Sequence, residues 1–389
     1  MKILMLSGDR SLAAGKRGAF YYLLEELSKY CERIDILCPE FHTKTQKHKN
    51  TVFFDNVYIH PSDFGVLRQP WFIKKKGVEL YNEHKHDIVL IHEYPPFYNS
   101  LGARLLRKKI DANSGEIGSL SSPSHGVKFV VEIHHIIGYP RRADLRESFY
   151  LWLSKIMIPR DCKRFDAVRV VNEKQVPELL EKWEVDKRKL YYASSMYIDL
   201  DVFKPMNLEK KYDLVFAGRL VKNKNVKMLI EAVKILRDKG RDLKCVIVGE
   251  GHEIENLKSK VKSFKLEKNV EFLGWLPTVE DVAKVYNQSK LFVMPSLNEG
   301  GPRVCLEAMA CGVPVVTTRV GIMLDIIKDG ENGFFCDWNA EDMAEKILET
   351  RNKETEKLRG ESVGTATQFE RKKMIKNLAE VYQRIVDKS

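Results

Sequence analysis

Two carboxylates stand eight positions apart in "EGGPRVCLEAMACGVPVV", which runs from Glu299 to Val316. The segment has the pattern of a loop, a helix and a buried strand, which places Glu299 before the helix and Glu307 about one turn inside it. Helical side chains lean toward the N-terminus of their helix, so both carboxylates can face one ligand. Carboxylates accept hydrogen bonds from paired hydroxyls. The alternative is structural, with Glu299 capping the helix and Glu307 pairing with a lysine.

The residues between the two carboxylates favour the binding of an anion. Gly300 and Gly301 leave backbone N–H groups uncovered where the helix dipole is positive. Pro302 suits the first helical position, and Val304 belongs to the buried face. The sequence therefore predicts phosphate oxygens at this helix end, with hydroxyls on either side of them.

A second strand, loop and helix pattern supplies cations. In "FAGRLVKNKNVKMLIEAV", Arg219 and Lys224 follow the strand that ends at Gly218. A guanidinium binds two oxygens at once and an ammonium adds a point charge, a combination that suits a diphosphate. The chain has no D-x-D motif, so we expect these cations and helix amides to meet the diphosphate charge in place of a metal. The alternative is a solvated surface loop.

Two motifs of the first half lie where a ligand could approach. The strand in "VVEIHHIIGYPRR" ends in two histidines, and because strand side chains alternate we expect His134, and not His135, to face the ligand. A purely structural histidine is the alternative. The segment "SGDRSLAAGKRGAFYYLLEEL" predicts a tight loop that meets a helix near Gly18. It lacks the dinucleotide fingerprint G-x-G-x-x-G.

These residues need a frame, and short β-branched runs alternate with helical patterns along the whole chain. The predicted strands are 2–6, 34–37, 52–59, 87–91, 128–134, 166–171, 212–218, 244–249, 270–274, 290–296, 313–318 and 333–336. The predicted helices are 18–31, 73–84, 97–109, 144–164, 225–239, 252–265, 278–288, 303–311, 340–351 and 367–386. We expect an α/β fold of two Rossmann-like, doubly wound parallel-sheet domains facing a central cleft, where the carboxyl ends of the strands bind ligands.

The length of 389 residues also predicts two domains. Residues 196–212 lack a helical period and form the predicted linker between domains at 1–195 and 213–366. The start "MKILMLSGDR" has no long apolar region, and no stretch approaches the length of a membrane span, so we expect a cytoplasmic protein. The seven cysteines form no C-x-x-C pair and are expected to be reduced and structural.

The formal net charge of +11 predicts an anionic partner. Cations mix with aromatic residues in 71–81 and 139–160, which would suit contact with an anionic membrane. The alternative is an ordinary core helix at 144–164. No aromatic-rich RNA-binding motif occurs, so nucleic acid is not expected.

The motifs together resemble a known family. The E-x7-E pattern at Glu299 and Glu307, "FAGRLVKNKNVKMLIEAV", "CVIVGEG", "VEFLGWLP" and "DGENGFF" are similar to retaining glycosyltransferases of the GT-B fold, specifically glycosyltransferase family 4 (group 1 type). The second half matches nearly throughout and the first half loosely. The resemblance implies an acceptor-binding first domain, a donor-binding second domain and a last helix, 367–389, that crosses back to the first.

The resemblance also implies roles for the candidate residues. Arg219 and Lys224 would bind the donor diphosphate, and Glu299 the hydroxyls of the transferred sugar. Glu307 would bind the ribose. The remaining contacts would come from the backbone around Trp275 and Leu276 against the base, amides near Gly301 and Pro302 on phosphate and sugar, and His134 beside the sugar. The chain departs from the family pattern in two places: "AAGKRGAF" keeps only Gly18 of a glycine pair, and Gly301 and Pro302 replace an aromatic residue and a glycine.

The implied activity is sugar transfer from a UDP- or GDP-linked donor, with retention of configuration and without a cofactor or metal. We expect a saccharide or lipid-linked acceptor in cell-surface glycan or glycolipid synthesis, with peripheral contact at the inner face of the membrane. Two alternatives stay open: a nucleotide-sugar epimerase on the same fold, which would consume donor without acceptor, and a non-catalytic nucleotide-sugar binding protein.

Overall fold

The computed structural model describes residues 1–9, 12, 17–39, 51–92, 95–113, 126–353 and 356–388, apart from the side chains of 51–53. The chain divides into two compact units. The first unit comprises Met1–Ile136, Trp152–Ser195 and Met374–Ser389, and the second comprises Ile137–Leu151 and Met196–Lys373. Residues 196–212, the predicted linker, thus belong to the second unit.

The first unit is built on an eight-stranded sheet in the order β3-β4-β2-β1-β5-β6-β7-β8. Strand β3 runs antiparallel to β4, and the other neighbouring pairs are parallel. The strands are β1 (Lys2–Leu6), β2 (Arg33–Cys38), β3 (Thr51–Phe53), β4 (Val57–Pro61), β5 (Ile88–His92), β6 (Lys128–Ile133), β7 (Ala167–Val170) and β8 (Leu190–Tyr192). The central strands are buried almost throughout, as strands covered on both faces must be.

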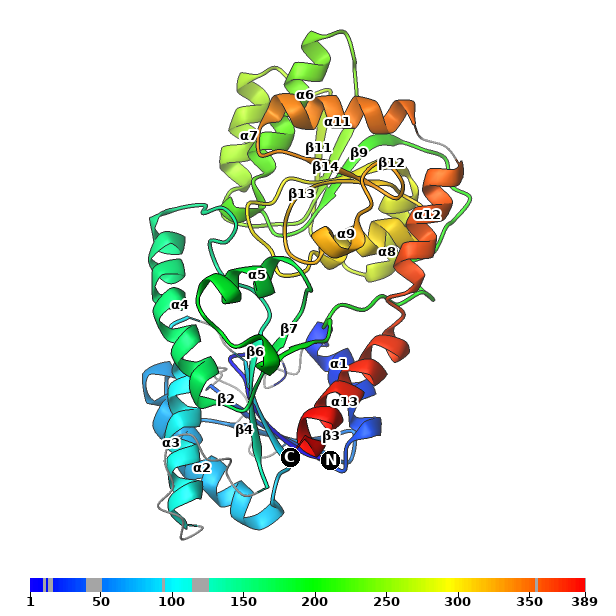
Figure 1. Ribbon diagram of the computed structural model, residues 1–389. Coiled ribbons are helices and arrows are strands. Elements are labelled where there is room, and N and C mark those ends of the chain that lie inside the picture. Colours follow the sequence, from blue (N-terminus) through cyan, green and yellow to red (C-terminus); the bar gives the residue numbers. More distant parts are fainter. Residues whose placement is uncertain are drawn as a thin grey trace. The chain divides into compact units, whose positions relative to one another are not determined.

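The helices of this unit are α1 (Ala19–Leu27), α2 (Gln69–His84), α3 (Tyr98–Asn113) and α5 (Gln175–Lys182). Helices α4 (Leu145–Arg164) and α13 (Arg371–Asp387) begin in the second unit and end in the first. Helices α2 and α3 lie side by side (Figure 1), because Gly102 leaves room for Ile73: a Cβ at position 102 would lie 2.7 Å from Ile73 Cδ1. Three single turns of 3-10 helix also occur: η1 (Ser28–Tyr30), η2 (Val66–Arg68) and η3 (Lys187–Lys189).

The second unit has a six-stranded parallel sheet in the order β11-β10-β9-β12-β13-β14. Its strands are β9 (Tyr212–Ala217), β10 (Cys245–Val248), β11 (Val270–Gly274), β12 (Ser289–Met294), β13 (Val315–Thr318) and β14 (Phe334–Cys336). The sequence order reverses direction at β9 and β12, which lie side by side in the middle. The carboxyl ends of these two strands therefore form the switch point of the sheet, where such folds bind ligands.

The helices of the second unit cover both faces of its sheet (Figure 1). Helix α6 packs against α7 and α11, and α9 packs against α8 and α12. The bounds are η4 (Lys222–Lys224), α6 (Val226–Asp238), α7 (Ile254–Ser263), α8 (Val279–Asn287), α9 (Arg303–Ala310), α10 (Met323–Ile326), α11 (Ala340–Asn352) and α12 (Glu356–Thr367). The inward face of α6, with Met228, Leu229 and Val233, is buried as its apolar period predicts.

One predicted element is wrong, and four helices and strands are missing from the prediction. Residues 52–59 form no continuous strand, because Phe54 and Asp55 adopt left-handed φ angles of 52° and 63° and turn the chain between β3 and β4. The sequence patterns do not predict β8, α5, α10 or α12, and α10 has only four residues. Strand β8 has three residues, and the short helices α5 and α12 contain a proline or glycines that weaken a helical pattern.

A close backbone contact fixes the ends of β9 and β10. Gly249 has a φ of +125°, and a Cβ there would lie 2.0 Å from the carbonyl oxygen of Gly218. The Gly249 N–H donates to the Gly274 carbonyl, which ties β10 to the end of β11 as well. Only glycine fits this position, so the three loops at this edge of the sheet depend on it.

We therefore predict that Gly249→Ala lowers the unfolding temperature of the protein by several degrees, since the clash and the strained φ together cost more than about 1 kcal/mol. Gly360→Ala is the matched control, because a Cβ in that helical position meets nothing within 4 Å. The control should keep or raise the melting temperature. Equal melting temperatures for Gly249→Ala and the wild type in differential scanning calorimetry would contradict the packing described for this edge.

Candidate functional site

An ion pair joins the two loops at the switch point of the second sheet. Lys224, at the end of η4, lies against the Glu299 carboxylate, which it contacts through Nζ and Oε1. The same loops are joined through the backbone, because the Leu297 N–H donates to the Asn223 carbonyl at 2.8 Å. The structure thus brings together a predicted phosphate-binding cation and a predicted hydroxyl-binding carboxylate.

The surroundings of this pair keep it in place. The side chains of Lys224 and Glu299 are 11% and 15% exposed, so most of their surface is shielded from water. The Ser296 hydroxyl donates to Glu299 Oε1 at 3.1 Å. Each charge retains hydrogen-bonding capacity toward a ligand, because an ammonium has three donors and a carboxylate has about four acceptor positions.

Helix α9 begins at Arg303, as the predicted range 303–311 has it, but the predicted place of Pro302 is wrong. Pro302 precedes helix α9 as its N-cap residue and is not the first helical residue, since its ψ of 89° lies outside the helical region. Proline has no N–H, so Pro302 cannot donate to phosphate. The backbone donors at this end belong instead to neighbours of Pro302, including Gly301, Arg303 and Val304.

Gly301 lies in a confined position within the second unit. A Cβ at this residue would lie 2.2 Å from the sulfur of Met196. The Gly300 carbonyl accepts from the Ile322 N–H at 3.0 Å, which fixes the loop before α9 from the other side. The departure from the family pattern at Gly301 and Pro302 is therefore accommodated by close packing against Met196.

Glu307 lies on helix α9, half-buried, where the Tyr286 hydroxyl donates to its Oε2 at 3.2 Å. Burial raises the pKa of the Glu307 carboxyl, and the nearby Arg303 charge and the Tyr286 hydrogen bond oppose that rise. Its partner is a tyrosine hydroxyl and not the lysine of the structural alternative. The other carboxylate oxygen gives Glu307 further acceptor capacity toward hydroxyls.

The remaining second-unit candidates follow β9 and β11, the two strands that flank β10. Arg219 is exposed, and its guanidinium has no hydrogen-bond or ion-pair partner among the residues that the structure describes. Trp275 and Leu276 follow β11, and 70% of the Trp275 surface is exposed. These positions match the predicted edge of the sheet, while their roles stay predictions.

His134 and Gly18 belong to the first unit. Gly18 is the N-cap of α1, and a Cβ there would meet nothing within 4 Å. His134 follows β6, and its side chain is 40% exposed. His135 is half-buried as well, so exposure alone does not separate the two histidines.

Three residues beside His134 escaped the sequence prediction. Glu132, Arg169 and His92 lie opposite one another on β6, β7 and β5, and all three surround the His134 ring. The available signal was a charged residue inside an apolar strand, Glu132 in "KFVVEI" and Arg169 in "AVRV". Such residues are almost never fully buried unless they are paired.

The ligand atoms of His92, Glu132 and His134 lie within 4.8 Å of one another, as in a metal site. The Arg169 guanidinium occupies the same space, because it pairs with Glu132 and its Nη2 lies 3.1 Å from His134 Nε2. A second cation there would meet like-charge repulsion and would have to displace Arg169. The donor set therefore fits a metal poorly.

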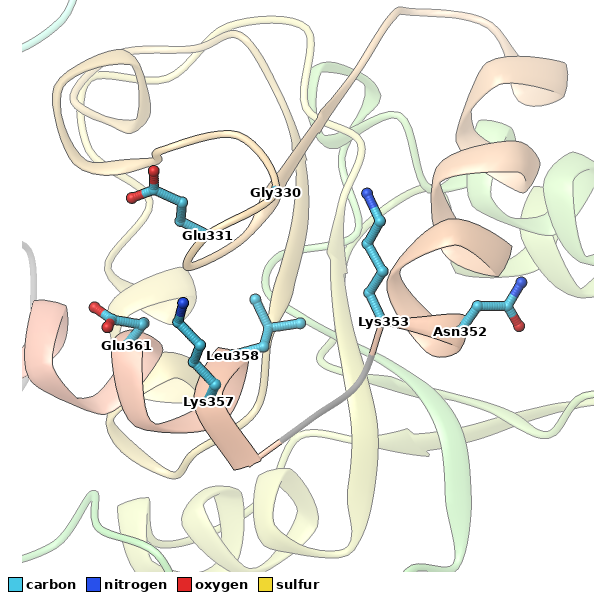
Figure 2. Close-up of a pocket in the computed structure, with 7 residues that line it drawn as sticks. All are labelled: Gly330, Glu331, Asn352, Lys353, Lys357, Leu358 and Glu361. Atoms are coloured by element: carbon cyan, nitrogen blue, oxygen red, sulfur yellow. The ribbon is translucent and has the colours of Figure 1, made fainter.

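A surface pocket in the second unit lies among other residues (Figure 2). It is lined by Gly330, Glu331, Asn352, Lys353, Lys357, Leu358 and Glu361. None of the predicted site residues lines it, and its lysines and glutamates give it no single charge. We assign it no function.

Comparison with known proteins shows which family part of the chain resembles. Residues 199–361 match the family model described as "Glycosyl transferases group 1". The capsular polysaccharide biosynthesis glycosyltransferase CapM of Staphylococcus aureus is 34% identical over 179 residues, which are 43% of this chain and 46% of that protein. The chain spans about half the length of the curated relatives it matches.

Two solved structures share the fold over the whole chain. Sucrose-phosphate synthase from Thermosynechococcus elongatus has a TM-score of 0.80 at 17% identity, and the alignment covers 100% of both chains. HepE from Anabaena, in complex with UDP and glucose, has a TM-score of 0.71 at 18% identity and is covered over 99% of this chain and 100% of that one. The predicted pair of parallel-sheet α/β domains is confirmed by these structures, and residues 199–361 are similar to the glycosyl transferases group 1 family.

Proposed function

We propose that this protein is a retaining glycosyltransferase of family 4 that transfers a sugar from a nucleotide-diphosphate sugar to an acceptor. The observation that carries the proposal is the contact between Lys224 and Glu299 at the switch point of a group 1 domain. It puts a diphosphate-binding charge beside a hydroxyl-binding carboxylate, as the donor requires. The predicted central cleft between the domains remains part of this proposal.

In this proposal Arg219 and Lys224 bind the diphosphate together with backbone N–H groups around Gly301. Glu299 accepts from the hydroxyls of the transferred sugar, and Glu307 accepts from the ribose hydroxyls. The backbone at Trp275 and Leu276 lies against the base. Metal is not needed for donor binding, because the cations and amides meet the diphosphate charge.

The transfer follows from these contacts. The bond from the anomeric carbon to the diphosphate oxygen breaks while the acceptor oxygen bonds to the same face of that carbon, and the acceptor proton passes to the departing diphosphate. The barrier falls because Lys224 and Arg219 stabilise the charge that grows on the leaving group. No protein nucleophile is required.

The donor is proposed to be UDP- or GDP-linked, and the acceptor a saccharide or a lipid-linked saccharide of a cell-surface glycan. The UDP and glucose bound to HepE and the capsular polysaccharide role named for CapM support this choice. An epimerase and a non-catalytic binder are less favoured, since the relatives are glycosyltransferases. Only a transferase would need an acceptor to release the nucleotide diphosphate.

We predict that Glu299→Ala and Lys224→Ala each reduce transfer by at least about a hundredfold, the usual loss when one electrostatic stabiliser is removed. The assay follows label from UDP-glucose or GDP-mannose into a saccharide or lipid acceptor, with anomeric configuration read by NMR. The matched controls are Lys227→Ala and Glu331→Ala, which remove exposed charges outside the site. Full turnover by both site variants, or donor consumption that ignores the acceptor, would contradict the proposal.

We further propose peripheral contact with an anionic membrane through a patch at the start of α2. Phe64, Leu67 and Trp71 are 47%, 72% and 62% exposed at spacings of three and four residues. Arg68, Lys74 and Lys75 are exposed beside them. Exposed apolar side chains rimmed by cations suit the interface of anionic lipid, where each cation near the surface adds about 1 kcal/mol.

A second exposed stripe on α4, made of Leu145, Phe149 and Trp152, is the rival surface. We favour the α2 patch because residues 63–76 hold four Lys/Arg and one Asp, whereas residues 141–152 around the α4 stripe hold three Arg, one Asp and one Glu. In the described part of the chain no helix has both the length and the apolar character for crossing a bilayer. The predicted cytoplasmic location, at the inner membrane face, remains a prediction.

We predict that the wild type sediments at low salt with vesicles that contain phosphatidylglycerol and not with pure phosphatidylcholine. The double variant Leu67→Ser and Trp71→Ser should lose at least about tenfold in partitioning, because two exposed apolar side chains no longer enter the interface. Trp152→Ser is the matched control and should bind as the wild type does. Loss of binding in the control alone, or no binding by the wild type, would refute the α2 assignment.

A further inference from the structure

A row of polar side chains crosses the otherwise apolar sheet of the first unit. His92, Glu132 and Arg169 are direct cross-strand neighbours on β5, β6 and β7. Glu132 and Arg169 are each 1% exposed. Burying an ion pair costs more desolvation energy than its attraction reliably returns, so apolar residues could fill this space at equal or better stability. Stability alone therefore does not account for the Glu132–Arg169 pair, whereas its contacts with neighbouring side chains can.

The Glu132 carboxylate accepts hydrogen bonds from three side chains. Arg169 Nε and the Tyr382 hydroxyl both donate to Oε1, and His92 Nε2 lies 2.9 Å from Oε2. Burial alone would raise the pKa of Glu132, but the Arg169 charge and the contact with His92 outweigh it and hold the pKa well below its ordinary value. Glu132 is thus ionised, and Tyr382 on α13 links the end of the chain to it.

The ionised Glu132 carboxylate determines which ring nitrogen of His92 donates to it. A carboxylate only accepts hydrogen bonds, so His92 carries its proton on Nε2. His92 Nδ1 lies 3.2 Å from the Ser7 hydroxyl, within hydrogen-bond distance. Both ring nitrogens of His92 are engaged within the protein.

Arg169 places the proton of His134 on the other ring nitrogen, Nδ1. Its Nη1 donates to the Ala193 carbonyl at 2.7 Å, and its Nη2 lies 3.1 Å from His134 Nε2. A guanidinium only donates, so Nε2 of His134 presents its lone pair to Arg169 and the proton lies on Nδ1. The pKa of His134 falls to about 4, because the partly buried ring loses hydration and the Arg169 charge lies beside it, while Glu132 opposes the fall.

The other ring nitrogen of His134, Nδ1, has only a long contact with the described part of the protein. Ser195 Oγ lies 3.4 Å from Nδ1, near the upper limit for a hydrogen bond. The His134 side chain is 40% exposed to solvent. A ligand atom could therefore take the Nδ1–H in place of Ser195. The lone pair, by contrast, is already held by Arg169.

We propose that His134 serves sugar transfer as a fixed hydrogen-bond donor through Nδ1–H, and that Arg169, Glu132 and Tyr382 are the positioning residues that hold it in this form. The ligand partner is an acceptor oxygen of the bound substrates, a hydroxyl or a phosphate oxygen. His134 cannot act as a general base, because its lone pair is taken. The inference rests on the proposed transfer for its function, while the form of the ring can be measured without it.

The first test is the ring nitrogen spectrum of the wild-type protein labelled with ¹⁵N-histidine, with His134 assigned by comparison with His134→Asn. We expect a neutral His134 at pH 7 with the proton on Nδ1, whereas histidine in water favours Nε2. In Arg169→Lys the proton should move to Nε2, since lysine lacks the fork that reaches Glu132 and His134 together. A wild-type His134 that is charged, or protonated on Nε2 alone, overturns the proposal even if Arg169→Lys fails to fold.

The second test compares replacements of His134 in the transfer assay. The amide of asparagine can take the place of Nδ1–H, whereas that of glutamine reaches toward the Nε2 position. We expect His134→Asn to retain kcat within about tenfold, and His134→Gln and His134→Ala to lose at least about a hundredfold. Equal losses in all three variants would contradict the donor role.

The positioning role of Tyr382 is tested by Tyr382→Phe, which removes only the hydroxyl from Glu132. We expect kcat to fall severalfold with little change in KM for the donor, together with a shifted His134 ring signal. Tyr58→Phe is the matched control, because it removes a hydroxyl whose hydrogen bond is exposed. Unchanged kcat and ring signal in Tyr382→Phe would remove Tyr382 from the assignment. Absence of transfer in the wild type would contradict the proposed function alone.

Discussion

The pairing of Lys224 with Glu299 is the interaction on which the account of the second unit depends. The two side chains follow β9 and β12, strands far apart in the sequence that become neighbours because the sheet reverses its winding there. Parallel strands end at the same edge, so the reversal alone brings the two loops together. The ion pair then holds each charge in a position that a diphosphate and a sugar hydroxyl could share.

Close backbone packing makes this arrangement possible. Gly249 fits against the end of β9, and Gly301 fits against Met196, at distances that exclude a side chain. Such contacts leave the loops little freedom to rearrange when a ligand binds. Preorganised charge of this kind stabilises a developing anion more effectively than charge that must first reorient.

The first unit uses buried charge for a different purpose. Glu132 and Arg169 lie within strands that pack on both faces, and their hydrogen-bonding capacity is spent on two histidines, a tyrosine and a backbone carbonyl. The pair fixes which nitrogen of each histidine carries the proton. A neutral ring of fixed orientation presents one donor and no base.

Much of this could be predicted from the sequence, because its signals are local. Apolar periods located most strands and helices, and the residue types around Glu299 and Lys224 indicated the chemistry before any contact was known. The rest depends on tertiary structure. The left-handed turn at Phe54 and Asp55 carries no glycine signal, and the displacement of Pro302 to the N-cap reflects the confined loop before α9.

The partners of His134 show the same limit. Arg169 meets Glu132 only through the pairing of β6 with β7, and Tyr382 reaches Glu132 across 250 residues. A single sequence gives no measure of either distance. A charged residue inside an apolar strand indicates that a partner exists without identifying it.

The central claim is that cations and amides at the switch point of the second sheet bind a diphosphate without metal. Isothermal titration of UDP, GDP, UMP and GMP in the presence of EDTA tests it most directly. We predict that one diphosphate binds at least about tenfold more tightly than its monophosphate, a difference of about 1.4 kcal/mol, and that added magnesium changes neither affinity. Equal affinities for the diphosphate and monophosphate, or diphosphate binding only with magnesium, would contradict it.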